Sequence, residues 1–546
     1  MGIKMPRPNL AVVLMAAYAG FCTAAIAATT CEELGKLQPA NTTITLSQTI
    51  AAGALTPPTG PLGPPGSVVP DFKKLPAFCR VMASVKPTAD SDIKVELWMP
   101  SEKWNGRFLG VGNGGLAGSI NYLELYFGLR RGYAVASTDT GHTAPKNGAP
   151  EAWGIGHPEK VVDFGYRGIH EMTRVSKEIT AAFYGRPAHS YFGSCSNGGR
   201  QALMEVQRFP QDYDGVIAGA PANFFTHVGA WALALGPAIA SGGYIPAAKI
   251  SALARAVNAT CDANDGLKDG ILTDPRTCRF DPQVLLCRKA GTEDCLTTKQ
   301  VATVKALYAG ARDATGTQIY PGFLPGAEDG IPGWSLWEMG PAPRQGLLFL
   351  LNRSYYAGLV YEKPDWDELH ANAEQAIRLA DAKTGTILNA VDPDLTAFRA
   401  RGGKLIVYHG WNDPALPALN TVNYYESVVA KMGPESVHGF VRLYMIPGMQ
   451  HCEAGAGPDY VGQPGYSQPI GTAVEDPVHN IQLALEQWAE KSVAPTEIIA
   501  TQYAGEGSRV TVRMTRPVCP YPQVATWTGR GRTDDAANFV CKWPSH

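Results

Sequence analysis

The chain has 546 residues, a formal net charge of −2 and a sequence pI near 6.6. Neither a basic excess, which nucleic-acid-binding proteins carry, nor an acidic tail is present. Charged residues make up only 18%, and glycine (59) and proline (42) are frequent, which is typical of a loop-rich, compact extracytoplasmic enzyme rather than a disordered protein. The length allows a large α/β core and a second unit, because domains usually run to ~100–200 residues.

The N-terminus has the pattern of a secretory signal. Lys4 and Arg7 precede an apolar run over residues 10–21, and an A-x-A site ends at Ala27. We predict cleavage after Ala27, so that residues 1–27 are removed and the mature chain is secreted or periplasmic. The alternative is an uncleaved membrane anchor. No later stretch approaches ~20 unbroken apolar residues, so we expect no membrane partner after cleavage.

The first half of the mature chain alternates between predicted strands and helices. Residues 28–90 are rich in proline and glycine and predict an irregular arm. Alternating apolar and polar residues predict a strand at 93–99, followed by strands at 107–111 and 133–137. The last two strands end in GNGG and TDTGH. Apolar residues at helical spacing then predict a long helix over 161–184.

A serine follows the next predicted strand, at 189–192. The sequence after this strand is GSCSNGGR, and residues 201–207 predict a helix. A serine at a tight strand-to-helix turn, followed by small residues, indicates the nucleophile elbow of an α/β-hydrolase, with Ser196 as nucleophile. The N–H of Asn197 would then face the reacting carbonyl. Ser194 stands where the elbow pattern has glycine, and an ordinary glycine-rich turn is the alternative.

The strand–helix rhythm is interrupted in the middle of the chain. A strand at 215–219 continues a mostly parallel sheet. Residues 221–401 then hold four cysteines, an acidic loop and many aromatic residues, which indicates an inserted lid domain. Residues 28–220 and 402–546 would form the α/β-hydrolase catalytic domain, with an extended tail from 496. The returning strands and helices are predicted at 404–408, 421–431, 441–446 and 477–489.

The two late strands supply candidates for a catalytic acid and base. They are followed by HGWNDP and PGMQHC, which place Asp413 and His451 at strand ends and in the chain order of an α/β-hydrolase triad. His451 would take the proton of Ser196, and Asp413 would hold the imidazole tautomer and stabilise the imidazolium. Asp459 is the rival acid. His409 is the rival base, although its place before the acid loop favours a packed histidine near the site.

An oxyanion hole needs a second N–H group besides that of Asn197. The GNGG sequence follows an early strand, where such a loop usually lies. We therefore expect the N–H of Gly114 or Gly115 to face the oxyanion. A plain turn is the alternative.

Ten of the eleven cysteines lie beyond the predicted signal, which contains Cys22. An even number in an exported chain predicts five disulfides. If Cys195 and Cys452 pair, their Cα atoms lie ~5.5 Å apart and hold Ser196 beside His451. That pair would leave Cys31 with Cys79. Local spacing favours the remaining pairs Cys261 with Cys278, Cys287 with Cys295, and Cys519 with Cys541.

The acidic loop has the sequence CDANDGLKDGI and starts at residue 261. Three carboxylates within eight residues repel one another unless they are solvated or bind a cation, and hard oxygen ligands suit Ca²⁺. Thr273 stands where an EF-hand would have its twelfth-position glutamate, and a zinc site is not expected because no histidine or free cysteine cluster accompanies the loop. A solvated loop is the alternative. The expected ligands are the Asp262, Asp265 and Asp269 carboxylates and the carbonyls of Leu267 and Ile271.

These motifs together resemble the tannase and feruloyl esterase family. Cys195-Ser196, Asp413 and His451-Cys452 match its CS-D-HC pattern, and the acidic loop, the TDTGH sequence and the RPVCPYP sequence near the C-terminus are similar as well. The resemblance spans nearly the whole mature chain. It implies the triad named above, the Cys195–Cys452 bridge and structural Ca²⁺ in the lid.

The resemblance also implies a substrate class. The family hydrolyses esters of aromatic acids: hydroxycinnamoyl esters, galloyl esters and, in one branch, mono(2-hydroxyethyl) terephthalate. Aromatic lid residues, Trp334 and Trp337 among them, would stack on the ring of the acid. Arg344 and Arg353 lie in the lid region where the terephthalate branch has an arginine, but no motif aligns them.

The expected function is that of a secreted serine carboxylesterase with an acyl-enzyme intermediate. A feruloyl esterase is the first hypothesis, and the substrate would be a small or polysaccharide-linked aromatic ester. Tannase and terephthalate-monoester hydrolase are the alternatives. A serine peptidase and a non-catalytic binding protein on the same fold are more distant ones. An active-serine probe separates the binding protein from the enzymes.

Overall fold

The computed structural model describes residues 1–2, 29–56, 70–144, 152–288, 294–330, 333–464, 474–504 and 511–544. Apart from residues 1–2, the predicted secretory signal lies outside these ranges, and so does its cleavage site.

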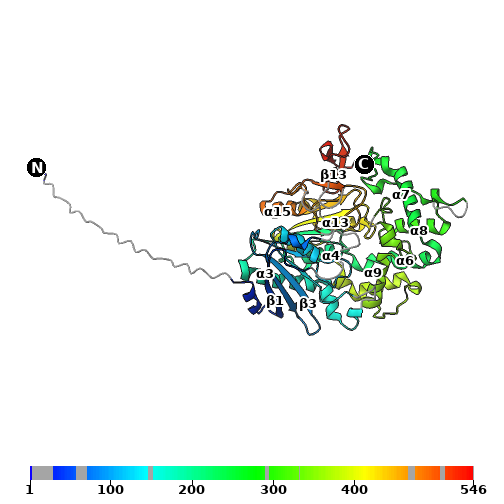
Figure 1. The fold of residues 1–546 in the computed structure, drawn as a ribbon. Coiled ribbons are helices and arrows are strands. Elements are labelled where there is room, and N and C mark those ends of the chain that lie inside the picture. Colours follow the sequence, from blue (N-terminus) through cyan, green and yellow to red (C-terminus); the bar gives the residue numbers. More distant parts are fainter. Residues whose placement is uncertain are drawn as a thin grey trace.

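A nine-stranded sheet runs through the molecule in the order β1-β2-β3-β5-β4-β6-β7-β10-β11 (Figure 1). In this order, the strands from β5 to β11 pair in parallel. β1 pairs with β2, β2 with β3 and β3 with β5, each in antiparallel fashion. The strands are β1 (Thr42–Ile50), β2 (Phe78–Val85), β3 (Ile93–Pro100), β4 (Arg107–Val111), β5 (Ala134–Thr138), β6 (His189–Cys195), β7 (Gly215–Gly219), β10 (Lys404–Gly410) and β11 (Val441–Ile446).

Helices cover both faces of this sheet because successive strand residues point to opposite sides. On β6, Phe192 belongs to one hydrophobic core and Tyr191 to the other, and on β10 Val407 and Ile406 divide in the same way. The arrangement confirms the α/β class. The first core is covered by α3 (Gly168–Tyr184), α4 (Asn197–Arg208) and α13 (Ala418–Met432), and the second by α1 (Tyr122–Arg130) and α15 (Ile481–Lys491).

The segment 28–90 is not irregular throughout, so that expectation was wrong. It contributes β1 and β2, which pair along their whole length at one side of the sheet. The prolines and glycines that suggested a loop cluster in residues 53–70, between these strands. Averaging the composition over the whole segment concealed the alternating pattern of β1, which is only half-buried because it is an edge strand.

The helix predicted over 161–184 is present but not uniform. It begins as α2 (Pro158–Val162), widens into a π-helical turn, η5 (Asp163–Arg167), and continues as α3. A π-turn leaves backbone carbonyls displaced from the regular helical ladder. Two of these carbonyls bind a side chain next to the candidate site, as described below.

The residues between β7 and β10 form a mainly helical segment beside the sheet (green in Figure 1). Its described residues add no strand to the nine-stranded sheet. They share a hydrophobic core with Leu116 and Phe164 of the sheet region. The elements are α5 (Phe225–Val228), α6 (Ala230–Ala238), α7 (Ala247–Cys261), α8 (Thr298–Ala309), β8 (Ala311–Arg312), β9 (Gln318–Tyr320), α9 (Leu347–Tyr355), α10 (Ala373–Ala380), α11 (Thr386–Leu388) and α12 (Thr396–Ala400).

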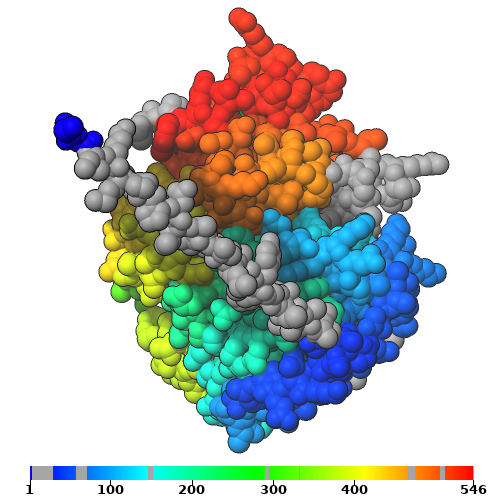
Figure 2. Space-filling model, turned by 90° about the vertical axis from the view of Figure 1, so that its left-hand side faces the viewer, coloured from blue at the N-terminus to red at the C-terminus, as the bar shows by residue number. Residues whose placement is uncertain are grey.

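The C-terminal residues form two small hairpins after α14 (Pro434–His438) and α15. Strand β12 (Ile498–Ala504) pairs with β13 (Thr511–Val518), and β14 (Val524–Trp527) pairs with β15 (Phe539–Lys542). In Figure 2 these residues (red) project from the end of the molecule opposite the N-terminal strands (blue).

All five disulfides suggested by the sequence are present. They are Cys31–Cys79, Cys195–Cys452, Cys261–Cys278, Cys287–Cys295 and Cys519–Cys541. Within the described ranges, no single helix is long and apolar enough to cross a membrane. Two consecutive helical segments, Phe225–Gly243 and Ala247–Asp265, pass that test only as a pair that bends by 109°.

Candidate active site

Ser196 lies at the turn between β6 and α4 in a backbone conformation that side chains rarely adopt. Its φ is 66° and its ψ is −125°. Its N–H donates to the carbonyl of Gly219 at 3.0 Å, and its own carbonyl accepts from the N–H groups of Arg200 and Ala222, each at 3.1 Å. Strain of this kind persists only where the surroundings fix the backbone, and it is frequent at active sites.

The two glycines after the serine allow this turn to form. A Cβ on Gly199 would collide with the carbonyl of Gly219, and a Cβ on Gly198 would collide with the side chain of Ser194. Ser194 therefore fits at the usual glycine position, and its hydroxyl donates to Glu124 Oε1 at 3.0 Å. This hydrogen bond was not predicted from the sequence.

Asp413 and His451 meet at the carboxyl ends of β10 and β11. The Nδ1 atom of His451 lies 2.8 Å from Oδ2 of Asp413, and both side chains are buried. Oδ1 of Asp413 accepts from the N–H groups of Ala415 (2.7 Å) and Leu416 (2.8 Å). Because the carboxylate only accepts, Nδ1 of His451 carries the proton and Nε2 is left as a base.

His409 supports the acid from its other side. Its Nε2 faces Oδ2 of Asp413 at 3.0 Å and the carbonyl of Leu416 at 3.1 Å, and its Nδ1 faces the hydroxyl of Thr421 at 2.7 Å. Burial alone raises the pKa of the Asp413 carboxyl, but the charges and hydrogen bonds of His451 and His409 outweigh it and hold that pKa well below its usual range. The rival acid, Asp459, instead accepts from the N–H of Ala454 at 2.7 Å.

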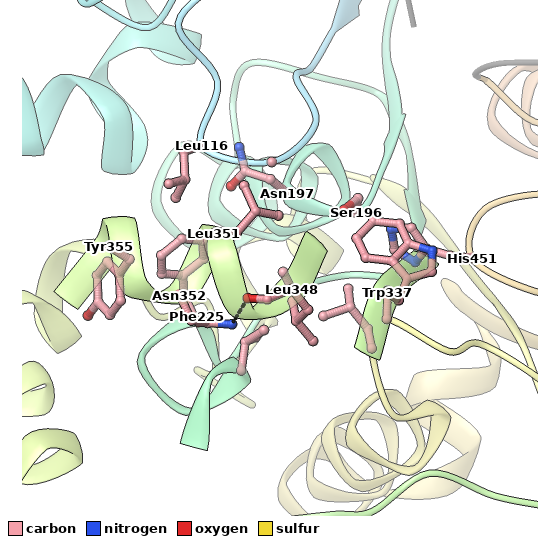
Figure 3. Close-up of a pocket in the computed structure, with 15 residues that line it drawn as sticks. Leu116, Ser196, Asn197, Phe225, Trp337, Leu348, Leu351, Asn352, Tyr355 and His451 are labelled. Atoms are coloured by element: carbon pink, nitrogen blue, oxygen red, sulfur yellow. Dashed lines mark hydrogen bonds between the residues drawn. The ribbon is translucent and has the colours of Figure 1, made fainter. Parts of the chain in front are cut away.

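Ser196 and His451 line the same cavity, where about 520 Å³ is free of protein atoms when the solvent space at its opening is included. Figure 3 shows the two side chains next to each other, with Trp337 beside them. The Cys195–Cys452 disulfide joins the residues adjacent to them in the chain, with Cα atoms 6.0 Å apart. The other lining residues are mainly apolar: Gly115, Leu116, Asn197, Ala222, Phe225, Val228, Leu348, Leu351, Asn352, Tyr355, Ala415 and Leu416.

Of the residues predicted for an oxyanion hole, Asn197 and Gly115 line this cavity. Gly114 is not among the lining residues, and its carbonyl accepts from the N–H of Ala117 at 3.0 Å. Gly115 has a φ of 54°, and a Cβ added to it would make only an ordinary contact with the side chain of Leu351. This leaves Gly115 as the better placed of the two glycines.

The TDTGH sequence holds this glycine loop in place. Nε2 of His142 lies 2.9 Å from the carbonyl of Leu116, and the amide of Asn113 donates to the carbonyl of Thr138 at 2.8 Å. Burial lowers the pKa of His142 to about 4, so the ring is neutral and donates through Nε2. The ring also stacks on Trp153, with centroids 3.8 Å apart. No structural role of this motif was predicted from the sequence.

Arg200 holds the side chain of Asn197, the residue after the serine. Its Nε donates to Oδ1 of Asn197 at 2.7 Å, and its other nitrogens donate to the carbonyls of Gly165 (2.8 Å) and Phe164 (3.2 Å) in the π-turn. The guanidinium also lies over the ring of Phe225. Burial lowers the pKa of Arg200 to about 9, so it stays charged at neutral pH. Arg200 thereby links the turn at Ser196 to the π-turn η5 and to the segment between β7 and β10.

The two tryptophans predicted for substrate binding lie in different places. Trp337 lines the cavity, and its ring meets that of His451 edge-on at 4.9 Å. Trp334 is fully buried against Tyr308 and Phe323 and is not a lining residue. The sequence analysis missed Phe225 and the lining side of α9, whose signal was the apolar run LLFLL.

The acidic loop lies between α7 and the C-terminal tail. Asp262 accepts from the N–H of Gly270 at 2.9 Å, Asp265 from Leu267 at 2.9 Å, and Asp269 pairs with Arg516 at 2.8 Å. Burial raises the pKa of the Asp262 carboxyl, and the charges of Asp269 and Asp265 raise it further. Oxygen donors of this kind suit Ca²⁺, but the three carboxylates are not among the groups of described residues whose ligand atoms all lie within 4.8 Å of one another. None of the five predicted ligands, Asp262, Asp265, Leu267, Asp269 and Ile271, lines the cavity at Ser196.

Comparisons with known proteins agree on one family. A family model described as tannase and feruloyl esterase matches residues 79–542. An uncharacterized esterase of Xanthomonas campestris pv. campestris is 38% identical over 96% of this chain and 93% of its own length. A probable feruloyl esterase B-2 of Aspergillus terreus is 34% identical over 85% of this chain and 86% of its own. The crystal structure of feruloyl esterase B from Aspergillus oryzae superposes with a TM-score of 0.83 at 31% identity, covering 94% of this chain and 99% of that one.

Proposed function

The chain belongs to the tannase and feruloyl esterase family, and on this premise we propose that it is a serine esterase that hydrolyses hydroxycinnamoyl esters through an acyl-enzyme. That it is a carboxylic ester hydrolase follows from the family. The observation that carries the finer proposal is the apolar cavity into which both Ser196 and His451 open.

In the proposed reaction, Nε2 of His451 takes the proton of the Ser196 hydroxyl as its oxygen attacks the ester carbonyl. Asp413 stabilises the imidazolium that forms. The N–H groups of Asn197 and Gly115 stabilise the negative charge on the carbonyl oxygen of the tetrahedral intermediate. His451 then gives the proton to the departing alcohol oxygen, which leaves the acid esterified to Ser196.

The second half of the reaction repeats these roles with water. His451 removes a proton from a water molecule, whose oxygen attacks the acyl carbonyl. The bond to Ser196 breaks, the serine oxygen regains a proton from His451, and the free aromatic acid leaves the cavity. The strained backbone at Ser196 keeps its hydroxyl at the mouth of the acyl site in both halves.

The composition of the cavity supports an uncharged aromatic acyl group. Phe225, Leu348 and Leu351 provide flat or branched apolar surface against which a phenyl ring and its propenoyl spacer can pack. Two polar side chains that line the cavity already form hydrogen bonds with the protein. Tyr355 shares a hydrogen bond of 2.7 Å with Thr384, and the Asn352 amide donates to the Leu348 carbonyl. In this mainly apolar lining, a galloyl ring with three hydroxyls would leave more hydroxyls without hydrogen bonds than a feruloyl ring with one hydroxyl.

A terephthalate monoester is disfavoured by its free carboxylate. None of the described residues that line the cavity is an arginine or a lysine. Arg344 and Arg353 both pair with the buried carboxylate of Glu368, the latter at 3.3 Å. An unpaired carboxylate in an apolar cavity costs several kcal/mol.

Initial rates on matched esters test this proposal. We expect kcat/KM for methyl ferulate and chlorogenate to exceed that for methyl gallate, and that for a terephthalate monoester to be lowest. p-Nitrophenyl acetate serves as the control for intrinsic esterase activity without an aromatic acid. If methyl gallate or the terephthalate monoester were turned over best, the hydroxycinnamoyl assignment would be wrong, although the family would stand.

Two further properties belong to this proposal. Five disulfides suit an oxidising compartment, which supports a secreted or periplasmic enzyme. The acidic loop of the inserted segment would hold a calcium ion through the carboxylates of Asp262, Asp265 and Asp269 and the carbonyls of Leu267 and Ile271. The ion would neutralise carboxylates that otherwise repel each other, as a structural element.

A further inference from the structure

A second cluster of possible ligands lies toward the opposite ends of the parallel strands from Ser196. His170 is on α3, Glu205 is in the last turn of α4, and Asp212 is in the loop that leads into β7. One ligand atom from each lies within 4.8 Å of the other two. Because Ser196 follows β6, Asp212 precedes β7 and the two strands are parallel, the cluster and the cavity lie at opposite strand ends.

Glu205 is the unusual member of this cluster. It is only 1% exposed, and neither carboxylate oxygen accepts a hydrogen bond from an N–H or hydroxyl donor of the described residues; its carboxyl group instead faces that of Asp212. Burial raises the pKa of Glu205 well above its usual value, and the nearby charge of Asp212 raises it further. A negative charge in the last turn of a helix is also unfavourable, because the helix dipole there attracts cations. Two facing carboxylates in this position need a proton or a metal ion between them.

The other two side chains of the cluster are in direct contact with each other and can be reached from solvent. Nδ1 of His170 lies 2.7 Å from Oδ2 of Asp212, and its ring stacks on Phe209 with centroids 3.9 Å apart. The His170 side chain is 29% exposed, which gives access from solvent. The neighbouring cation, Lys177, donates to the backbone carbonyl of Asp212 rather than to a carboxylate.

We propose that His170, Glu205 and Asp212 bind a divalent transition-metal ion, of which Zn²⁺ is the best fit. Imidazole nitrogen with carboxylate oxygens suits zinc, whereas calcium and magnesium prefer oxygen alone. Tetrahedral zinc holds its ligand atoms ~3.3 Å apart, so the His170 and Asp212 side chains need to separate by less than ~1 Å to admit it. Water completes the coordination. The ion ties α3 to the end of α4.

Calorimetric titration with ZnCl₂ tests this site directly. The mature protein is kept in excess CaCl₂ and treated with a chelator selective for zinc, so that the acidic loop is not disturbed. We expect one zinc per chain and a Tm rise of about 2 °C at a free concentration 100-fold above Kd. Anomalous diffraction at the zinc edge should place the ion between the three side chains.

The variants Glu205→Gln and His170→Gln should each weaken zinc binding at least 100-fold, whereas Glu178→Gln, on the exposed side of α3, should not. His170 is partly exposed, so its variant decides the question if the buried glutamine variant fails to fold. Absence of binding to the wild type, or equal binding by His170→Gln, overturns the proposal. A Glu205→Gln variant that is as stable as the wild type, with no zinc effect in either, would show that the carboxylates share a proton instead.

Discussion

Among single residues, Glu124 shows most clearly how the interior behind the nucleophile elbow affects a titratable side chain. It is fully enclosed behind Ser194, with one oxygen accepting from that hydroxyl and the other without a hydrogen-bond partner. Burial raises the pKa of Glu124 from its usual 4.5 to about 8, although the hydrogen bonds of Ser194 and Asn121 lower it. At neutral pH the folded protein therefore keeps this side chain mostly protonated.

The Glu124→Gln variant should become more stable relative to the wild type as the pH rises. Between the unfolded and folded pKa values the folded wild type binds more protons than the unfolded chain, so its stability falls from about pH 4.5 to about pH 8, by at most ~5 kcal/mol. Glutamine does not titrate. Urea unfolding at pH 5 and pH 8 measures the difference, with the exposed Glu102→Gln as the control. A difference that does not change with pH would contradict this account.

The residue types of the proposed triad could be predicted from the sequence, whereas several supporting contacts could not. A serine between a strand and a helix, and an acid and a histidine after later strands, are local signals. The contacts of Ser194 with Glu124 and of Asp413 with His409 depend on how distant or neighbouring segments pack. Spacing along the chain carries no information on such contacts.

At the scale of the element, the Cys195–Cys452 disulfide joins the end of β6 to the loop after β11. The two cysteines are 257 positions apart, and each is adjacent to a residue of the cavity. Loops vary in position more than strands do. The disulfide therefore limits how far His451 can move from Ser196.

The double variant Cys195→Ala with Cys452→Ala should lower kcat more than it raises KM. A displacement of ~1 Å between reacting groups can reduce a rate ~100-fold. Loss of the disulfide should also lower the free energy of unfolding, by up to ~5 kcal/mol in the loop-entropy model. Steady-state kinetics at a temperature where the variant stays folded separate the two effects. The pair Cys287→Ala with Cys295→Ala, whose residues do not line the cavity, is the control. An equal loss of kcat in both double variants would contradict the proposed role.

Strands were predictable where periodicity was local and strong. β4, β7 and β11 have the bounds expected from the sequence. The π-turn at 163–167 was not predicted because its apolar spacing continues that of the flanking helices. Its reason is tertiary: it presents two carbonyls to the Arg200 guanidinium. β1 was missed because an edge strand buries little of its surface.

At the scale of the whole molecule, the cavity lies where two parts of the chain meet. Ser196 and His451 come from the sheet region, whereas Phe225, Trp337 and α9 come from the segment between β7 and β10. From the sequence we expected residues 221–401, which are rich in aromatic residues, to form an inserted lid. The sequence could not identify which aromatics face the cavity, because Trp334 and Trp337 are three residues apart and only the packing separates their environments.

Removal of calcium should lower the Tm without removing activity at low temperature. A ligand that binds the folded state alone stabilises it by mass action, and the acidic loop is not part of the cavity. Thermal unfolding with EGTA, and again after CaCl₂ is added back, measures the effect. Asp265→Asn should reproduce the loss and abolish the response to calcium. If metal analysis shows that calcium has been removed and the Tm is unchanged, the calcium site is refuted. If activity is lost while the fold stays intact, the ion has a catalytic role instead.

We propose Ser196 as the nucleophile of an esterase that acts on esters of aromatic acids. The most direct test of this proposal is kcat/KM on methyl ferulate for the wild type and for Ser196→Ala, with Ser190→Ala, at the other end of β6, as the control. Loss of a triad nucleophile lowers the rate by ~10⁴-fold or more. We predict a loss of this size for Ser196→Ala with its Tm maintained and activity near that of the wild type for Ser190→Ala, whereas turnover by Ser196→Ala within about tenfold of the wild type would contradict the account.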